Sequence, residues 1–170
     1  MNELVSIIMP SYNTGRFIGE TIESVLAQSY KNWELIIVDD CSKDDTDDIV
    51  SQYLADARVH YIKNEINSGA ASSRNRAIME AHGKWIAFLD SDDIWYPEKL
   101  ERQISFMKEN DYHFSYTKYE EIDESGNTIG IVVSGPERIN KQMMYAYCWP
   151  GCLTVMYDSN VTGGGLQLLI

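Results

Sequence analysis

The segment WIAFLDSDD, residues 85–93, carries the pattern that decides the fold: an apolar run typical of a buried strand ends in three carboxylates. In an open α/β sheet, ligands bind in the crevice beyond the carboxyl ends of the strands, so carboxylates placed there can hold a divalent cation against a phosphate. Paired acids are frequent in this chain, but only those at 90–92 and 39–40 directly follow apolar runs. This placement makes these two pairs candidate ligand-binding residues.

Strand and helix patterns alternate on either side of this segment. Short β-rich runs predict strands at 5–9, 33–38, 59–62 and 85–89, and helical spacing predicts helices at 16–28, after 42–48, at 71–81 and from Pro97. This order predicts parallel pairing with right-handed crossovers. Two later runs, 114–122 and 128–133, flank a turn and predict a β-hairpin. We therefore expect an α/β fold with a mixed, mostly parallel, Rossmann-like sheet flanked by helices.

The composition narrows the class of protein. A chain of 170 residues, 44% of them hydrophobic, is expected to form one domain spanning 1–170. The formal net charge of -12 argues against a nucleic-acid partner, because binding to nucleic acid depends on basic side chains. No apolar stretch approaches the roughly 18 residues that span a bilayer, and the three cysteines favour reduced thiols over zinc or disulfides. These features predict a cytoplasmic protein.

The strand ends supply groups that suit a nucleotide ligand. Neither of the two common glycine-rich phosphate loops is present, so phosphates need another anchor. Asp90 and Asp92 could share a divalent metal that bridges them to a diphosphate. Tyr12 offers a flat face for a base, and Asp40 could accept a hydrogen bond from an N–H of that base. The alternatives are that Tyr12 only packs and that Asp40 only caps the next turn.

Arg74 and Arg76, near the start of a predicted helix, could meet phosphate oxygens. The alternative is a solvated helix face on which they pair with Glu80. Taken together, groups at four successive strand ends converge on one edge of the sheet, which favours a binding site.

Four ordered motifs carry a family resemblance. They are VSIIMPSYN at 5–13, WELIIVDDCS at 33–42 (preceded by QSY at 28–30), NSGAASSRN at 67–75 and FLDSDD at 88–93. In this order and at these separations the chain resembles a family 2 glycosyltransferase with the GT-A fold. The resemblance is strong over 4–100 and weaker over 114–157.

The resemblance implies an inverting enzyme of polysaccharide biosynthesis that transfers a sugar from a nucleotide donor, usually a UDP-sugar, to a hydroxyl of a saccharide or lipid-linked saccharide. Such an acceptor implies a place in the cytoplasm or at the cytoplasmic face of the membrane. By motif, the donor-binding residues are Pro10, Tyr12, Asp40, Arg74, Asp90, Ser91 and Asp92. The resemblance further implies a metal, Mn²⁺ or Mg²⁺, bound by Asp92 and Asp90, with Asp92 in the most direct contact.

The resemblance does not extend to a general base. Relatives carry an acidic pair for this role beyond the point where this chain stops, and Asp158 is the first candidate inside it. We therefore expect a nucleotide-sugar-binding half at 1–100 and an incomplete acceptor-side half at 101–170. The sequence leaves open a donor-binding module without turnover. A phosphotransferase of the haloacid dehalogenase type is favoured less. That fold has Thr or Val two places after the second Asp, whereas Trp95 follows Asp93-Ile94 here, and this chain has no matching lysine motif downstream.

Overall fold

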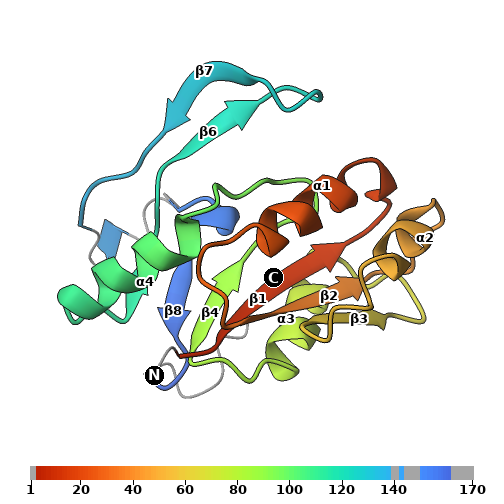
Figure 1. The fold of residues 1–170 in the computed structure, drawn as a ribbon, viewed down its shortest axis with the longest axis horizontal. Coiled ribbons are helices and arrows are strands. Elements are labelled where there is room, and N and C mark those ends of the chain that lie inside the picture. Colours follow the sequence, from red (N-terminus) through yellow and green to blue (C-terminus); the bar gives the residue numbers. More distant parts are fainter. Residues whose placement is uncertain (1–2, 139–141, 144–149, 162–170) are drawn as a thin grey trace.

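The computed structural model describes residues 3–138, 142–143 and 150–161. Its centre is a six-stranded sheet made of β1 (Val5–Ser11), β2 (Trp33–Asp39), β3 (Val59–Lys63), β4 (Trp85–Phe88), β5 (Phe114–Ser115) and β8 (Met156–Asp158). The strand order is β3-β2-β1-β4-β8-β5 (Figure 1). The first four strands pair in parallel, whereas β8 runs antiparallel to β4 and β5. The predicted α/β fold with a mixed, mostly parallel sheet is confirmed.

Helices cover both faces of this sheet. Val5, Ile7 and Met9 of β1 pack in one hydrophobic cluster with α1 (Gly15–Leu26), α2 (Thr46–Ser51) and α4 (Lys99–Glu109). Ile8 faces the opposite side and packs in a second cluster with Ala77 of α3 (Ala70–Met79). Every residue of β1 and β2 is buried, as expected for parallel strands covered on both faces. Among the described residues, no helix has the length and apolar character needed to cross a membrane.

The helix expected from Pro97 begins two residues later. The backbone N–H of Lys99 donates to the carbonyl of Tyr96 at 3.0 Å, which leaves Pro97 in the preceding turn. The next N–H, of Leu100, donates at 3.1 Å to the buried side-chain oxygen of Gln28. Since the first N–H groups of a helix lack intrahelical partners, this contact with Gln28 helps to fix where α4 starts.

The predicted hairpin is correct only in its second part. β6 (Tyr119–Ile122) and β7 (Thr128–Val133) pair as a separate two-stranded sheet, which projects from the main body in Figure 1. β5 instead joins the main sheet, where Ser115 is buried and accepts a hydrogen bond from Gln103 of α4 at 2.9 Å. The mixed character of the main sheet therefore comes from β8 rather than from the hairpin.

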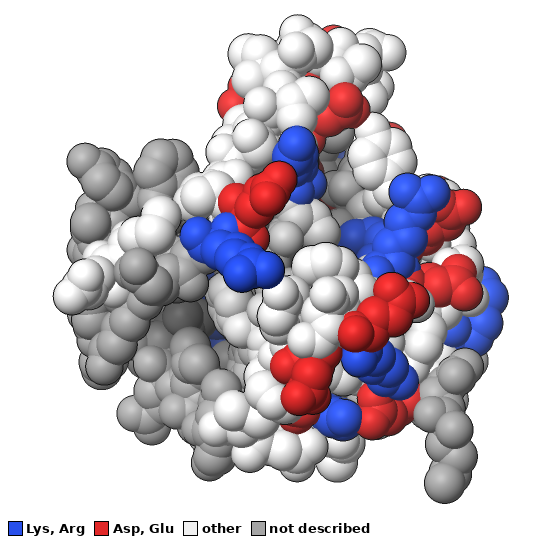
Figure 2. All heavy atoms as spheres, turned by 90° about the vertical axis from the view of Figure 1, so that its left-hand side faces the viewer, with Lys and Arg blue, Asp and Glu red and all other residues white. Residues whose placement is uncertain are grey.

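The surface charge is mixed in sign on the face that carries α4. Figure 2 shows acidic and basic side chains interspersed there. At the start of α4, Glu98 and Arg102 form an ion pair of 2.5 Å. On this face of the described residues, basic side chains do not form a continuous patch.

Candidate functional site

The carboxyl ends of three neighbouring strands meet at one edge of the sheet. β1 lies between β2 and β4, and its last residue, Ser11, is in register with Asp39. The N–H of Asp40 donates to the carbonyl of Ser11 at 2.8 Å. On the other side of β1, the N–H of Leu89 donates to the carbonyl of Ile8 at 3.1 Å, so that Asp90 follows β4 at the same edge. The topology thus brings the predicted motifs of β1, β2 and β4 together.

Tyr12 presents an exposed ring at this edge. Pro10 is buried within β1, and Tyr12, just past the end of that strand, has 49% of its surface exposed. The loop that follows is fixed to the loop after β2, because the N–H of Asn13 donates to Ser42 Oγ at 2.9 Å and Asn13 Oδ1 accepts from the N–H of Lys43 at 2.8 Å. The ring of Tyr12 is therefore held on a braced loop and is free to stack on a planar ligand.

Asp40 is buried and organises the loop before α3. Its carboxylate accepts from Asn64 Nδ2 at 2.7 Å, from the N–H and Oγ of Ser68 at 3.0 and 3.1 Å, and from the N–H of Gly69 at 2.6 Å. Burial raises the pKa of Asp40, but these hydrogen bonds outweigh burial and leave the pKa below its usual value. A carboxylate has about four acceptor sites, so the loop already engages the acceptor capacity of Asp40.

Arg74 and Asp90 form an ion pair within the site. Arg74, from α3, donates to Asp90 Oδ1 at 2.5 Å, and the two side chains are 19% and 29% exposed. The Nε of Arg74 is buried and has no hydrogen-bond partner among the described residues. Arg76 lies elsewhere: it donates to the carbonyl of Lys63 and to Asn64 Oδ1 at 2.9 and 2.5 Å, and so supports the connection between β3 and α3. Of the two arginines, Arg74 is the one that lies beside the acidic motif.

The other three residues of the acidic motif after β4, Ser91, Asp92 and Asp93, differ in how far they are buried. Ser91 is buried, and its carbonyl accepts from Thr21 Oγ1 at 3.1 Å, which fixes the turn against α1. Asp92 is exposed. Asp93 is half-buried, and burial, followed by the charges of Asp90 and Asp92, raises its pKa to about 6. Asp92 is thus the member of the motif that is open to a ligand.

A divalent metal is compatible with these residues. Among the described residues no three His, Cys, Asp or Glu side chains gather closely enough to hold a metal by themselves. Mg²⁺ and similar hard cations are often bound by only one or two carboxylates together with water and substrate phosphates. The exposed carboxylate of Asp92 fits that mode, and Asp90, already paired with Arg74, fits a secondary role.

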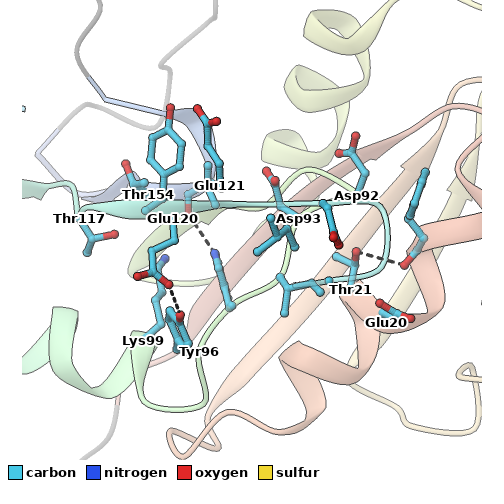
Figure 3. Close-up of a pocket in the computed structure, with 18 of the residues that line it drawn as sticks. Glu20, Thr21, Asp92, Asp93, Tyr96, Lys99, Thr117, Glu120, Glu121 and Thr154 are labelled. Atoms are coloured by element: carbon cyan, nitrogen blue, oxygen red, sulfur yellow. Dashed lines mark hydrogen bonds between the residues drawn. The ribbon is translucent and has the colours of Figure 1, made fainter. Parts of the chain in front are cut away.

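A pocket of about 560 Å³ adjoins this edge (Figure 3). Its walls come from the start of α1, from the segment between β4 and α4, and from the β6–β7 hairpin with the residues before it. Asp92 lines the pocket, whereas Tyr12, Asp40 and Arg74 are absent from its described lining. We call Tyr12, Asp40, Arg74, Asp90 and Asp92 the strand-end cluster. The pocket is distinct from this cluster, but Asp92 belongs to both.

Asp158, the first candidate for a general base, does not lie at this site. It is buried on β8 opposite Trp85, at the beginning of β4, whereas Asp90 follows the end of that strand. Its carboxylate faces His113 at 3.5 Å and Lys84 at 3.8 Å. Asp158 is therefore too far from the strand-end cluster to accept a proton there.

Two features of the site lay beyond the sequence analysis. The bonds from Asn64 and Ser68 to Asp40 depend on how the loop folds back, although the motif at 67–75 pointed to the region. No sequence pattern indicated that the ammonium of Lys99 is buried in the pocket wall, because a lysine at the start of a helix is ordinarily solvated.

Comparison with solved structures supports the same architecture. The structure is similar to that of TarS from S. aureus (residues 1–349) in complex with UDP, with a TM-score of 0.76 and 26% sequence identity over 94% of this chain and 48% of that one. The complex of the same protein with UDP-GlcNAc gives a TM-score of 0.75 at 26% identity, over 94% of this chain and 46% of that one.

Two bacterial proteins are similar in sequence. One is TuaG of Bacillus subtilis (strain 168), which carries the name of a teichuronic acid biosynthesis glycosyltransferase; it is 47% identical over 94% of this chain and 64% of its own length. The other is WfgD of Escherichia coli, a UDP-Glc:alpha-D-GlcNAc-diphosphoundecaprenol beta-1,3-glucosyltransferase, 47% identical over 91% of this chain and 60% of its own length. The chain thus spans less than two thirds of each relative.

The model of the family described as Glycosyl transferase family 2 matches residues 6–151, which include the strand-end cluster and most of the pocket. This match removes the ground for a haloacid dehalogenase interpretation of the acidic motif. The chain belongs to glycosyl transferase family 2.

Proposed function

We propose that this chain binds a UDP-sugar at the carboxyl edge of β1, β2 and β4 and takes part in transfer of the sugar to a saccharide hydroxyl. The observation that carries the proposal is the convergence of Tyr12, the Arg74–Asp90 pair and the exposed Asp92 on that edge, in a member of this family. TarS, with 26% identity, was crystallised with UDP and with UDP-GlcNAc, which supports uridine as the base.

The base would lie on the exposed ring of Tyr12, with the buried Pro10 behind it in β1. An N–H of uracil would reach the carboxylate of Asp40 by displacing one of the donors that now occupy it. Base binding would then be coupled to the position of the 64–69 loop. The Nε of Arg74, which has no hydrogen-bond partner within the described part of the chain, would be a donor for an oxygen of the diphosphate.

Asp92 would be the main protein ligand of a divalent metal, and Asp90, restrained by Arg74, would assist. When bound, such a metal supplies positive charge that offsets the charge building on the departing diphosphate. In a net-acidic chain this role matters, because the carboxylates at this edge would otherwise repel the donor.

In the transfer, the acceptor oxygen attacks the anomeric carbon while the bond from that carbon to UDP breaks. UDP leaves with the bonding electrons, and the acceptor proton passes to a base. The name of WfgD specifies a β-linkage made from UDP-Glc, whose glucosyl bond is α, so inversion is the outcome that this likeness supports. The same name supports a saccharide linked through diphosphate to a lipid carrier as the acceptor class.

The test is a radiolabelled transfer assay with UDP-glucose and UDP-GlcNAc as donors, Mn²⁺, and carrier-linked GlcNAc as acceptor. Label should pass from a UDP-sugar to the acceptor, and Asp92→Asn should lower transfer by about 10²-fold or more, since it weakens stabilisation of the leaving group. Asp111→Asn, an exposed position with φ of 53° that asparagine tolerates, is the matched control.

Metal-dependent UDP-sugar binding without transfer to any saccharide would instead support the interpretation of a donor-binding module. Absence of both binding and transfer would contradict the proposed function.

A further inference from the structure

The two ends of the pocket beside Asp92 carry different charged groups. Figure 3 places Asp92, Asp93 and Glu20 toward one end, and Lys99, Tyr96, Glu120 and Glu121 toward the other. The first end meets the candidate metal site, because Asp92 belongs to both. A ligand lying along the pocket would therefore meet only carboxylates among the charged groups at the Asp92 end, and an ammonium together with carboxylates at the Lys99 end.

Lys99 is buried at its end of the pocket in an unusual way. Its Nζ is fully buried, has no hydrogen-bond partner among the described residues, and lies 3.7 Å from the centre of the Trp95 ring. Trp95 itself is 4% exposed and is fixed by a hydrogen bond from Nε1 to the carbonyl of Leu153 at 2.9 Å. Burial lowers the pKa of Lys99 to about 7. The stacking on Trp95 offsets only part of the cost of removing an ammonium from water.

The nearby carboxylates do not neutralise Lys99. Glu120 accepts from Tyr96 Oη at 2.7 Å, and Glu124 pairs with Arg16 at 2.9 Å. Within the described part of the chain, no carboxylate lies within ion-pair distance of Lys99 Nζ. A buried cation that lines a pocket without a counter-ion is complementary to an oxyanion brought by a ligand.

We propose that the Lys99 end of this pocket binds an oxyanion of the acceptor, and that Lys99 is a specificity-determining residue for acidic saccharides. The oxyanion would be a sugar carboxylate or the phosphate that joins a sugar to its carrier. Such an acceptor would lie with its anionic group at Lys99 and a hydroxyl toward Asp92, where the donor is proposed to bind. The inference rests on the proposed function, because it takes the ligand of the pocket to be the acceptor.

The selectivity follows from how well a charged and a neutral ligand each compensate for the burial of the Lys99 ammonium. The flexible stem lets the ammonium turn from the Trp95 ring toward the ligand. A carboxylate or phosphate then forms a charge-assisted hydrogen bond in a site of low polarity, whereas a neutral hydroxyl offers only a dipole. A site with a buried polar group discriminates strongly against ligands that leave this group unpaired. We expect the charged ligand to bind at least about tenfold more tightly than its neutral counterpart.

The test uses two matched pairs of small saccharides with the chain saturated with UDP and Mg²⁺, which is diamagnetic and does not broaden the signals of the ligands. The first pair, methyl β-D-glucuronide and methyl β-D-glucoside, probes a carboxylate. The second, GlcNAc 1-phosphate and GlcNAc, probes a phosphate. Dissociation constants are measured by ligand-observed NMR, and the pair that shows the tenfold preference identifies the source of the oxyanion.

Lys99→Met should weaken binding of the preferred charged saccharide by at least about tenfold and change binding of its neutral partner less than about twofold. Lys31→Met removes the same charge from an exposed lysine outside the described lining of the pocket and should change both less than about twofold. Equal effects of the two variants would overturn the proposal, because they would indicate a general field rather than a contact with Lys99.

The wild-type chain tests the proposal even if Lys99→Met fails to fold. Equal or undetectable binding of the charged and neutral members of both pairs overturns it. If UDP still binds in a metal-dependent way in that experiment, the proposed function stands and only the acceptor subsite fails. If UDP does not bind either, both fail.

Discussion

At the residue scale, the Asp40 carboxylate links two parts of the candidate site. Asp40 directly follows β2, which carries the motif at 33–42, and it accepts hydrogen bonds from Ser68 and Gly69 of the motif at 67–75. The loop before α3 is therefore held by one buried acid, which is 2% exposed. A substitution at Asp40 should therefore destabilise the loop before α3, whether or not a ligand is bound.

Asp40→Asn should lower the free energy of unfolding by about 1–3 kcal/mol, because an amide NH₂ would face a donor from Ser68, Gly69 or Asn64. Urea denaturation gives the value. Asp48→Asn, at an exposed position on α2, should stay within about 0.5 kcal/mol of the wild type. Equal stability of the two variants would show that Asp40 does not hold the loop.

At the element scale, the start of β1 packs closely against the connection between α3 and β4. The N–H of Gly83 donates to Ser6 Oγ at 2.7 Å. A Cβ at position 83 would lie 2.6 Å from the N of Ser6, 2.7 Å from its Oγ and 2.9 Å from the carbonyl oxygen of Leu4. Because two of these atoms belong to the backbone, the contact cannot be relieved by a side-chain rotation.

Gly83→Ala should therefore destabilise the chain by about 1–3 kcal/mol. Gly19→Ala is a matched control within α1, where a Cβ would come no closer than 3.4 Å to Tyr53 Oη. The control should gain about 0.5–1 kcal/mol, since glycine is unfavourable inside a helix. Comparison of both variants by urea denaturation checks the prediction, and a neutral Gly83→Ala would contradict the close packing seen here.

Sequence patterns predicted the elements whose side chains have a regular period. The β1–β4 strands and the α1 and α4 stripes were predicted closely because continuous burial or helical spacing is visible locally. β8 was missed, because a three-residue strand has no period and pairs with β4 only through the tertiary fold. The separation of β5 from β6 likewise depends on the contact of Ser115 with α4.

In the candidate site, too, some features could be predicted from local sequence patterns and others depend on the tertiary fold. The sequence placed Tyr12, Asp40 and Asp92 after strands, and parallel pairing brings such positions to one edge. Their roles toward a ligand remain predictions. The pairing of Arg74 with Asp90 and the burial of Lys99 depend on packing between distant segments, which local patterns do not encode.

On the scale of the whole molecule, Glu3 ties the beginning of the chain to β4 and α4. Its carboxylate contacts Lys84 Nζ at 2.7 Å, Lys108 Nζ at 2.9 Å and Trp85 Nε1 at 3.0 Å. The hydrogen bond from Lys84 is the main cause that lowers the pKa of Glu3 to about 2, with burial opposing it and Lys108 and Trp85 adding to it. Folding therefore favours the ionised form of Glu3.

Because this pKa lies below the ordinary value of 4.5, the stabilisation is present above about pH 4.5 and is lost as the pH falls toward 2. Glu3→Gln should lower the thermal unfolding midpoint at pH 7, and the difference from the wild type should shrink between pH 4.5 and 2. Glu109→Gln, an exposed position on α4, controls for the loss of one negative charge. A difference that is the same at pH 7 and pH 2 would contradict this role of Glu3.

The central claim, a UDP-sugar site that depends on metal and on Asp92, is tested most directly by calorimetric titration of UDP into the chain. The account predicts that UDP binds with Mn²⁺ present, and that removal of the metal or Asp92→Asn weakens binding at least about tenfold. Asp111→Asn should bind as the wild type does. UDP affinity that is unchanged both without metal and in Asp92→Asn would contradict the account.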